Sequence, residues 1–193
     1  MSILKEVIRE LSEAEYSCNS NVKGFIEMIG LEKFIPSDRD TWTWQLAQLK
    51  DVPEIVQLAY DNFQHEFAPL MEIKPALFFR NVSIAIQKQS YNLGEENFLV
   101  ARDRTTNELV AYSWIQRQQY LSFSPDEMAE ARFAHVKMDL PVRARITLLA
   151  QMLHQWYFWA SVCKIPVLIS SSIRDDQDVF MKLHRQAGFT VIG

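Results

Sequence analysis

The order of helical and strand-like segments after residue 40 is the feature that most constrains the fold. Apolar residues at steps of three and four predict helices, and alternating or short β-rich runs predict strands. The segments in chain order are a strand at 42–46, helices at 51–63 and 75–91, a hairpin of 97–101 with 109–115, a short helix at 124–127, a strand at 133–138, a long helix at 142–162, a short buried strand at 166–170, a helix at 175–187 and a strand at 189–192. This order predicts an α/β or α+β protein, with helices on the faces of a mixed sheet.

The first forty residues form a separate unit in this interpretation. Residues 3–16 and 21–29 carry apolar side chains at helical spacing, and Pro36-Ser37-Asp38 interrupts the pattern. We therefore divide the chain into an N-terminal helical extension, residues 1–40, and a main domain, residues 41–193. We expect the extension to pack on the main domain or on a partner.

Glycine is scarce, and this scarcity excludes several classes of site. The 193-residue chain has 5 glycines, and none lies between Gly94 and Gly188. Loops that wrap phosphate in a P-loop or in the dinucleotide-binding fingerprint need several closely spaced glycines. We therefore expect neither kind of loop in this protein.

Charge and cysteine content indicate a protein of a reducing compartment. The formal net charge of −4 disfavours nucleic acid as a partner, although residues 131–193 carry eight basic and four acidic side chains. That excess fits either a local anion site or a chance asymmetry. The two cysteines are far apart, the four histidines lack metal-ligand spacing, and no apolar run is long enough to cross a membrane. We expect no metal, and we expect a cytoplasmic protein or a part of an intracellularly assembled complex.

Four local sequences, in the right order, resemble the GNAT superfamily of acyl-CoA-dependent N-acyltransferases. They are WQLA (44–47) with DVPEI (51–55), NFLVA (97–101) with ELVAY (108–112), VRAR (142–145) before an apolar helix, and LHRQAGF (183–189). The resemblance covers about residues 41–193. It implies a GNAT-like mixed, mostly antiparallel sheet flanked by helices, and acetyl-CoA as the acyl donor.

The resemblance also implies where acyl-CoA would bind. In this family, backbone N–H groups at the start of the long helix hold the pyrophosphate, because a helix N-terminus presents unpaired donors and the positive end of the helix dipole. Arg143, Ala144 and Arg145 fall at this place and are the candidate binding residues. The two arginines could instead be solvated, with their stems packed on aromatic rings.

The family pattern at this place is Gln/Arg-x-x-Gly-x-Gly/Ala, and this chain departs from it. In the best gapless frame, Ile146 and Leu148 stand at the glycine positions. The CoA loop and active site are therefore degenerate relative to the family, and this chain either has lost acetyl-CoA binding or binds acetyl-CoA without the usual backbone cradle. A fourth candidate for acyl-CoA binding is Gln177, at a position where the family often has asparagine.

Two histidines match positions of acid–base chemistry in the family. His184 occupies the place of a tyrosine that protonates the departing thiolate, and His135, on the strand at 133–138, is the candidate general base, with a water molecule as the alternative. Each histidine could instead be a structural residue. If the protein is active, acyl-CoA would lie between the strands at 133–138 and 166–170, where these strands separate.

Two functions stay open at this stage. The first is an N-acyltransferase that moves an acetyl group from acetyl-CoA to an amine. The second is a catalytically inactive GNAT-fold module with a structural or protein-binding role in a larger assembly, for example a virion or a regulatory complex. Residues 1–40 or an unfinished sheet edge near the C-terminus would bind the partner, which includes a second copy of the chain.

Overall fold

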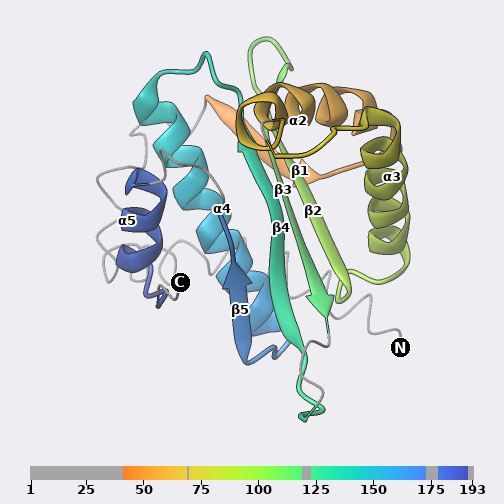
Figure 1. Cartoon of the computed structure of the whole chain (residues 1–193), viewed down its shortest axis with the longest axis vertical. Coiled ribbons are helices and arrows are strands. Elements are labelled where there is room, and N and C mark those ends of the chain that lie inside the picture. The colour runs from red at the N-terminus through yellow and green to blue at the C-terminus, as the bar shows by residue number, and fades with distance from the viewer. Residues whose placement is uncertain (1–40, 69, 119–122, 173–177, 191–193) are drawn as a thin grey trace.

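The computed structural model describes residues 41–68, 70–118, 123–172 and 178–190 of the chain (Figure 1). The elements are β1 (Trp42–Leu46), η2 (Leu49–Asp51), α2 (Val52–Glu66), α3 (Pro75–Tyr91), β2 (Glu96–Asp103), β3 (Leu109–Gln118), β4 (Met128–Val136), α4 (Val142–Val162), β5 (Val167–Ser170) and α5 (Asp178–Gln186). The extension at 1–40, the candidate Gln177 and the end of the strand expected at 189–192 lie outside the described residues. Among the described helices, none is both long enough and apolar enough to span a lipid bilayer.

The five strands form one sheet in the order β1-β2-β3-β4-β5. The first three pairings are antiparallel, and β4 pairs with β5 in parallel. The β2–β3 hairpin turns where the sequence predicts it. There Asp103 accepts backbone hydrogen bonds from Thr105 and Thr106, and Asn107 adopts a positive φ of 59°. The expected fold class, a mixed and mostly antiparallel sheet with helices, is confirmed.

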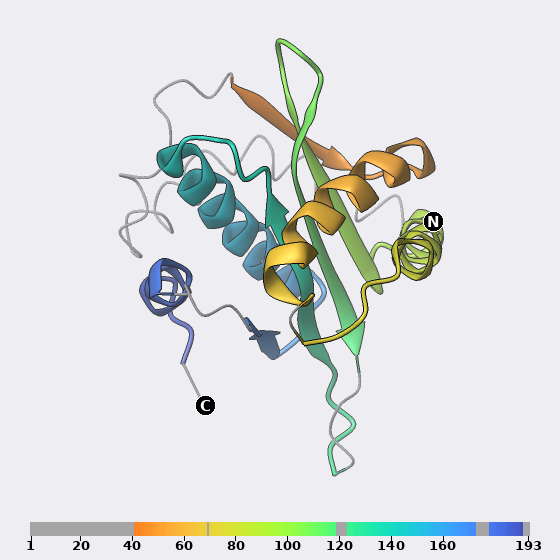
Figure 2. The same cartoon turned by 45° about the horizontal axis from the view of Figure 1, so that its top comes forward.

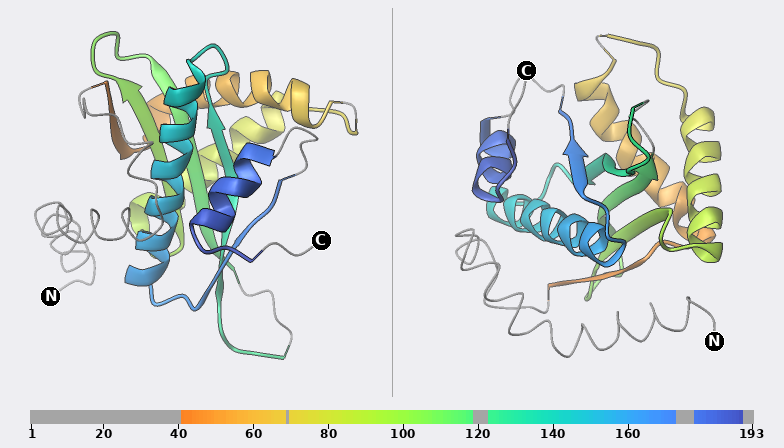
Figure 3. Two further views of the ribbon diagram at one scale, coloured as in Figure 1. Left: turned by 90° about the vertical axis from the view of Figure 1, so that its left-hand side faces the viewer. Right: turned by 90° about the horizontal axis from the view of Figure 1, so that it is seen from below.

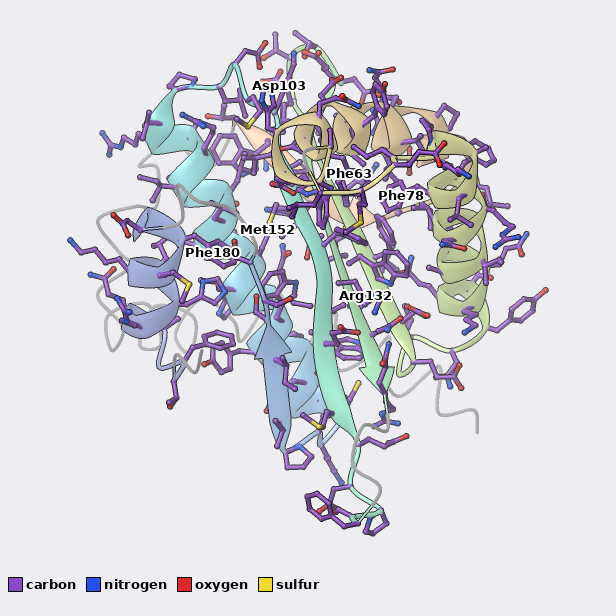
Figure 4. All side chains as sticks on the ribbon, in the orientation of Figure 1. Phe63, Phe78, Asp103, Arg132, Met152 and Phe180 are labelled. Carbon is purple, nitrogen blue, oxygen red and sulfur yellow. The ribbon has the colours of Figure 1, made fainter. Side chains whose placement is uncertain are left out.

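Helices cover both faces of the sheet (Figures 1 and 3). On one face, α2 and α3 pack over β2 and β3, and the core there centres on Phe98, Tyr112 and Trp114. Figure 2 shows α2 and α3 on the same side of the strands. Phe63 of α2 and Phe78 of α3, labelled in Figure 4, meet edge to face with ring centroids 5.0 Å apart.

The second core lies between the sheet and α4, with α5 packed alongside. The expected long helix at 142–162 is confirmed; its Trp156 and Trp159 are buried in the core, and Tyr157 packs against it. Trp156 donates its ring N–H to Ser113 Oγ of β3 at 2.6 Å, and Trp159 donates to the carbonyl of Leu93 at 2.7 Å. Leu183 and Ala187 of α5 are buried in the same cluster. Gly188, with φ of 88°, follows α5, as the sequence predicts for a helix end.

Two local expectations are wrong. Residues 124–127 form no helix, because the Ser124 hydroxyl accepts the backbone N–H of Asp126 in a tight turn that leads into β4. The strand β5 is not fully buried: Val167 is 41% exposed and Ile169 is 38% exposed. In the described part of the chain β5 pairs with β4 alone, so it lies at the edge of the sheet.

The strands β4 and β5 separate halfway along β4. Their last pair is Ala131 with Ser170, and β4 continues for five more residues to Val136. At the same point β4 has a bulge, since Trp114 of β3 pairs with Phe133 and Ile115 with Ala131, leaving Arg132 as the extra residue. A bulge bends its strand and increases the local twist. Arg132 (labelled in Figure 4) therefore marks the place where the sheet opens.

Candidate active site

A cavity of about 510 Å³ occupies the place where β4 and β5 separate. Its lining combines residues 130–136 of β4, Ser170 at the end of β5 and residues 171–172 after it with helices from both faces of the sheet. The helix residues that matter below are Asn62, Glu66 and Phe67 near the end of α2, and Arg145, Ile146 and Trp156 of α4. The cavity therefore reaches both faces through the opening in the sheet, and two reactants could meet inside it from opposite sides.

On the α2 side, His135 joins a buried chain of hydrogen bonds. Its Nδ1 lies 2.6 Å from the Tyr112 hydroxyl, and its Nε2 lies 3.0 Å from Glu66 Oε2. Burial, and to a lesser extent the charge of Glu66, raises the pKa of Tyr112 well above its usual value, so this phenol keeps its proton. With the phenol as donor to Nδ1, the Nε2–H of the imidazole donates to Glu66. These hydrogen bonds thus hold an imidazole and a carboxylate together in the cavity wall.

On the α4 side, His184 lies behind the cavity wall and contacts it through Ser170. His184 is 4% exposed, its Nδ1 lies 2.9 Å from the carbonyl oxygen of Phe180, and its Nε2 lies 3.2 Å from Ser170 Oγ. Burial is the main influence on this imidazole and lowers the pKa of His184, while the hydrogen bond to Phe180 opposes the change. The imidazole is therefore neutral at pH 7.

The start of α4 presents donors that suit an anion. Arg145 donates its backbone N–H to the carbonyl of Pro141 at 3.1 Å. The N–H groups of Val142, Arg143 and Ala144 precede it, in the first turn, where a helix has no acceptor of its own to offer. Arg145 also lines the cavity, and its Nε is buried without a hydrogen-bond partner among the described residues.

The structure shows where the two positions lie at which the family pattern has glycine. Ile146 and Leu148, which stand at the glycine positions in the sequence comparison, both lie in the second turn of α4. Leu148 is fully buried in the core, and Ile146 lines the cavity. Backbone N–H groups of a second turn are bonded within the helix, so glycine at these two positions would not expose donors to a phosphate. The available donors are the N–H groups of residues 142–144, two to six residues earlier.

The candidate residues thus fall in two groups around one cavity. His135 lies in its wall, His184 lies one hydrogen bond behind it, and Arg145 lines its α4 side, next to Arg143 and Ala144. Neither Glu66 nor Ser170 stands out as a functional residue from sequence patterns alone. Glu66 is 69 residues from His135, and only the packing of α2 across β4 brings the two together. Within the described residues, no cluster of three His, Cys, Asp or Glu side chains could hold a metal ion.

The fold of this chain is similar to that of solved acetyltransferase structures, over nearly their whole length. The sequence itself matches no protein-family model and no curated protein.

Three of these structures show the degree of similarity. A predicted acetyltransferase from Clostridium acetobutylicum, in a structure with acetyl-CoA, gives a TM-score of 0.61 at 12% identity, covering 78% of this chain and 91% of its own. Glucosamine-6-phosphate N-acetyltransferase from Arabidopsis thaliana gives 0.57 at 10% identity, covering 79% and 94%. Ribosomal-protein-alanine N-acetyltransferase from Brucella melitensis biovar Abortus gives 0.56 at 15% identity, covering 79% and 94%. The chain therefore has the GNAT fold, which confirms the resemblance found in the sequence.

Proposed function

We propose that the protein is an N-acyltransferase that moves an acetyl group from acetyl-CoA to an amine. The observation that carries this proposal is the cavity at the opening between β4 and β5, which is lined by residues from both faces of the sheet. The Glu66–His135 pair lies in its wall on the α2 side, and His184 lies one hydrogen bond behind its wall on the α4 side. Such a cavity brings an acyl donor and an acceptor together without either having to leave first.

The residues at the start of α4 fit the anionic part of acyl-CoA. Three first-turn N–H groups, the helix dipole and the Arg145 side chain combine as donors for a pyrophosphate, with Arg143 beside them. The buried, unpartnered Nε of Arg145 supports this assignment, because such a donor is costly to bury without an acceptor. Acetyl-CoA supplies an activated thioester carbonyl.

Glu66 and His135 fit the amine side. A primary amine is an ammonium ion at neutral pH and must lose a proton before it can attack a carbonyl. The Glu66 carboxylate would attract the ammonium ion. The Glu66–His135 pair would then accept its proton, the role that the sequence assigned to His135 alone. Phe67 and Phe133 give this side of the cavity an apolar wall, which favours an amine with an apolar neighbouring group.

A thiol-release assay tests the proposal. Purified protein, acetyl-CoA and a panel of primary amines should release CoA thiol at a rate that depends on the amine. Glu66→Gln should lower this rate by roughly 10²-fold, since a positioned base contributes about 10²–10⁴-fold. Glu72→Gln, in an exposed loop after α2, is the matched control and should keep the wild-type rate. Amine-independent thiol release, or equal rates for both variants, would contradict the proposal.

A protein-binding module is the second candidate, favoured by the edge of the sheet. In the described chain β5 has one neighbouring strand, and Val167 and Ile169 are exposed beside it. Such an edge can accept a strand from a partner or from a second copy. If this is the function, Val167→Lys should abolish self-association or partner binding in sedimentation experiments, and acetyl-CoA should have no effect on it.

A further inference from the structure

The outward side of α4 is shielded from solvent along most of the helix. Trp156 faces the sheet, where its ring N–H bonds to Ser113 of β3. His154 and Phe158 stand two residues before and after Trp156, and at 3.6 residues per turn such positions lie on nearly the opposite side of a helix. Both side chains are nevertheless half-buried, and no residue of α4 from 144 to 160 is exposed. Burial also lowers the pKa of His154, as expected for an imidazole that is shielded from water.

The described neighbours of α4 account for its other sides. The sheet lies under it, and α5 lies along one flank, where Tyr157 contacts Phe189 with ring centroids 5.3 Å apart. On the other flank, Gln151 Oε1 accepts hydrogen bonds from the rings of Trp42 and Trp44 of β1, each at 2.8 Å. In the left view of Figure 3, no other described helix or strand lies over α4. The shield on its outward side therefore comes from outside the described ranges.

A buried polar atom on the β1 flank of α4 points to the same conclusion. Gln155 lies one turn after Gln151, and residues four apart share a helix face. Its Oε1 is buried and finds no hydrogen-bond partner among the described side chains and backbone groups. Buried acceptors are paired in nearly all proteins, because an unpaired one is costly. A donor from another part of the chain, or from another molecule, is therefore expected to meet Gln155.

The chain enters the main domain beside this face. Trp42 is the second described residue, and its hydrogen bond to Gln151 places the end of the extension next to the middle of α4. The eleven residues 30–40 reach about 36 Å when extended, which exceeds the length of about 31 Å for a 21-residue helix. Any position along α4 is thus within reach of the helix that the sequence predicts at 21–29. Its apolar side consists of Val22, Phe25, Ile26 and Ile29.

Two further properties favour this segment over a separate partner. A segment on a short tether meets its site at an effective concentration in the millimolar range, which few separate partners reach. Charge also agrees, since residues 1–40 carry eight acidic and five basic side chains, whereas α4 carries Arg143 and Arg145 and no acidic side chain.

We infer that the outward face of α4 is a docking surface for residues 21–29 of the same chain. The apolar side of this segment packs on Phe158 and its neighbours, and a polar group of the extension pairs with Gln155. The extension then holds α4, whose first turn carries the donors described above, from the side away from the sheet.

Hydrogen exchange of the full chain, read by mass spectrometry of peptides that cover 21–29, tests this inference. The amides of 21–29 should exchange at least roughly tenfold more slowly than in the isolated peptide, the slowing that about 1.4 kcal/mol of docking free energy gives. Ile26→Lys should remove the slowing, because it places a charge in the apolar side of the segment. Glu27→Lys introduces the same residue on the polar side of the predicted helix, and this matched control should keep the slowing.

Changes on α4 test the other half of the contact. Phe158→Asp should have the same effect as Ile26→Lys, whereas Ser161→Asp, at an exposed position of the same helix, should have none. If Phe158→Asp unfolds the protein, as judged by circular dichroism, Ile26→Lys decides, because Ile26 belongs to the extension and not to the core of the main domain.

Slow exchange that persists on dilution and is removed by Ile26→Lys supports docking within one chain. Slow exchange that disappears on dilution assigns the face to a second copy and overturns the inference. Fast exchange of 21–29 in the wild type, or slow exchange that Ile26→Lys leaves unchanged, also overturns it. The assay contains neither acetyl-CoA nor an amine, so its outcome is independent of the acyltransferase proposal.

Discussion

Removal of the Tyr112 hydroxyl is the sharpest test of the hydrogen-bond chain on the α2 side. The change Tyr112→Phe keeps the ring, which stacks on Phe98 with centroids 5.6 Å apart. It deletes only the oxygen that lies 2.6 Å from His135 Nδ1. Any loss of stability therefore reports the hydrogen bond and not the packing.

The magnitude follows from burial. Tyr112 is fully buried and His135 is 5% exposed, so water cannot replace the lost donor at Nδ1. A buried polar group left without a partner costs about 1–3 kcal/mol, and the complete burial here favours a value near 2 kcal/mol. For a chain of this size such a loss corresponds to a decrease in Tm of roughly 4–8 °C.

Urea denaturation, followed by tryptophan fluorescence, measures this loss. The midpoint should fall while the slope m stays constant, because the surface exposed on unfolding is unchanged. Tyr91→Phe is the control, since Tyr91 is 85% exposed, and its effect should stay within about 0.5 kcal/mol. A Tyr112→Phe protein as stable as the control would refute the hydrogen-bonded chain.

Three further changes test other parts of the structure. Arg102→Met leaves the fully buried carboxylate of Asp51 without its partner at 2.8 Å and should lower the free energy of unfolding in urea by about 3–5 kcal/mol. Burial raises the pKa of Glu96, so the wild type loses stability as pH rises above the ordinary range of a carboxyl group. The free energy of unfolding of Glu96→Gln should therefore increase relative to that of the wild type between pH 4 and pH 7. A difference that stays constant with pH would contradict this prediction. Arg145→Ala should weaken acetyl-CoA binding roughly 10- to 100-fold in calorimetry, whereas Arg80→Ala, on exposed α3, should leave it unchanged.

The spacing of apolar residues predicted most of the helices and strands. The clearest spacing occurs in elements that bury one face or their whole surface. The long helix α4 and the β2–β3 hairpin occur where the sequence places them. The strand β5 was harder to judge. A run of apolar residues indicates burial, but Val167 and Ile169 lie at a sheet edge, and edge position depends on which strands pair.

The site was predicted in part, and its limits are physical. Histidines stand out in a sequence, so His135 and His184 could be singled out, and the arginines at the start of a long helix indicate an anion site. Their partners could not be identified in this way. Glu66 and Ser170 are ordinary in sequence and become significant only when α2 crosses β4 and β5 ends beside α5.

Calorimetric titration of the protein with acetyl-CoA tests the central claim, that the opening between β4 and β5 is an acyl-donor site. We expect one bound molecule with a micromolar Kd, displaced by CoA. Saturation at about 100 times Kd should stabilise the protein by about 2.7 kcal/mol. The absence of both heat and a thermal shift at about 1 mM acetyl-CoA would contradict this claim. Any binding would then be weaker than a millimolar Kd, which corresponds to only about 4 kcal/mol.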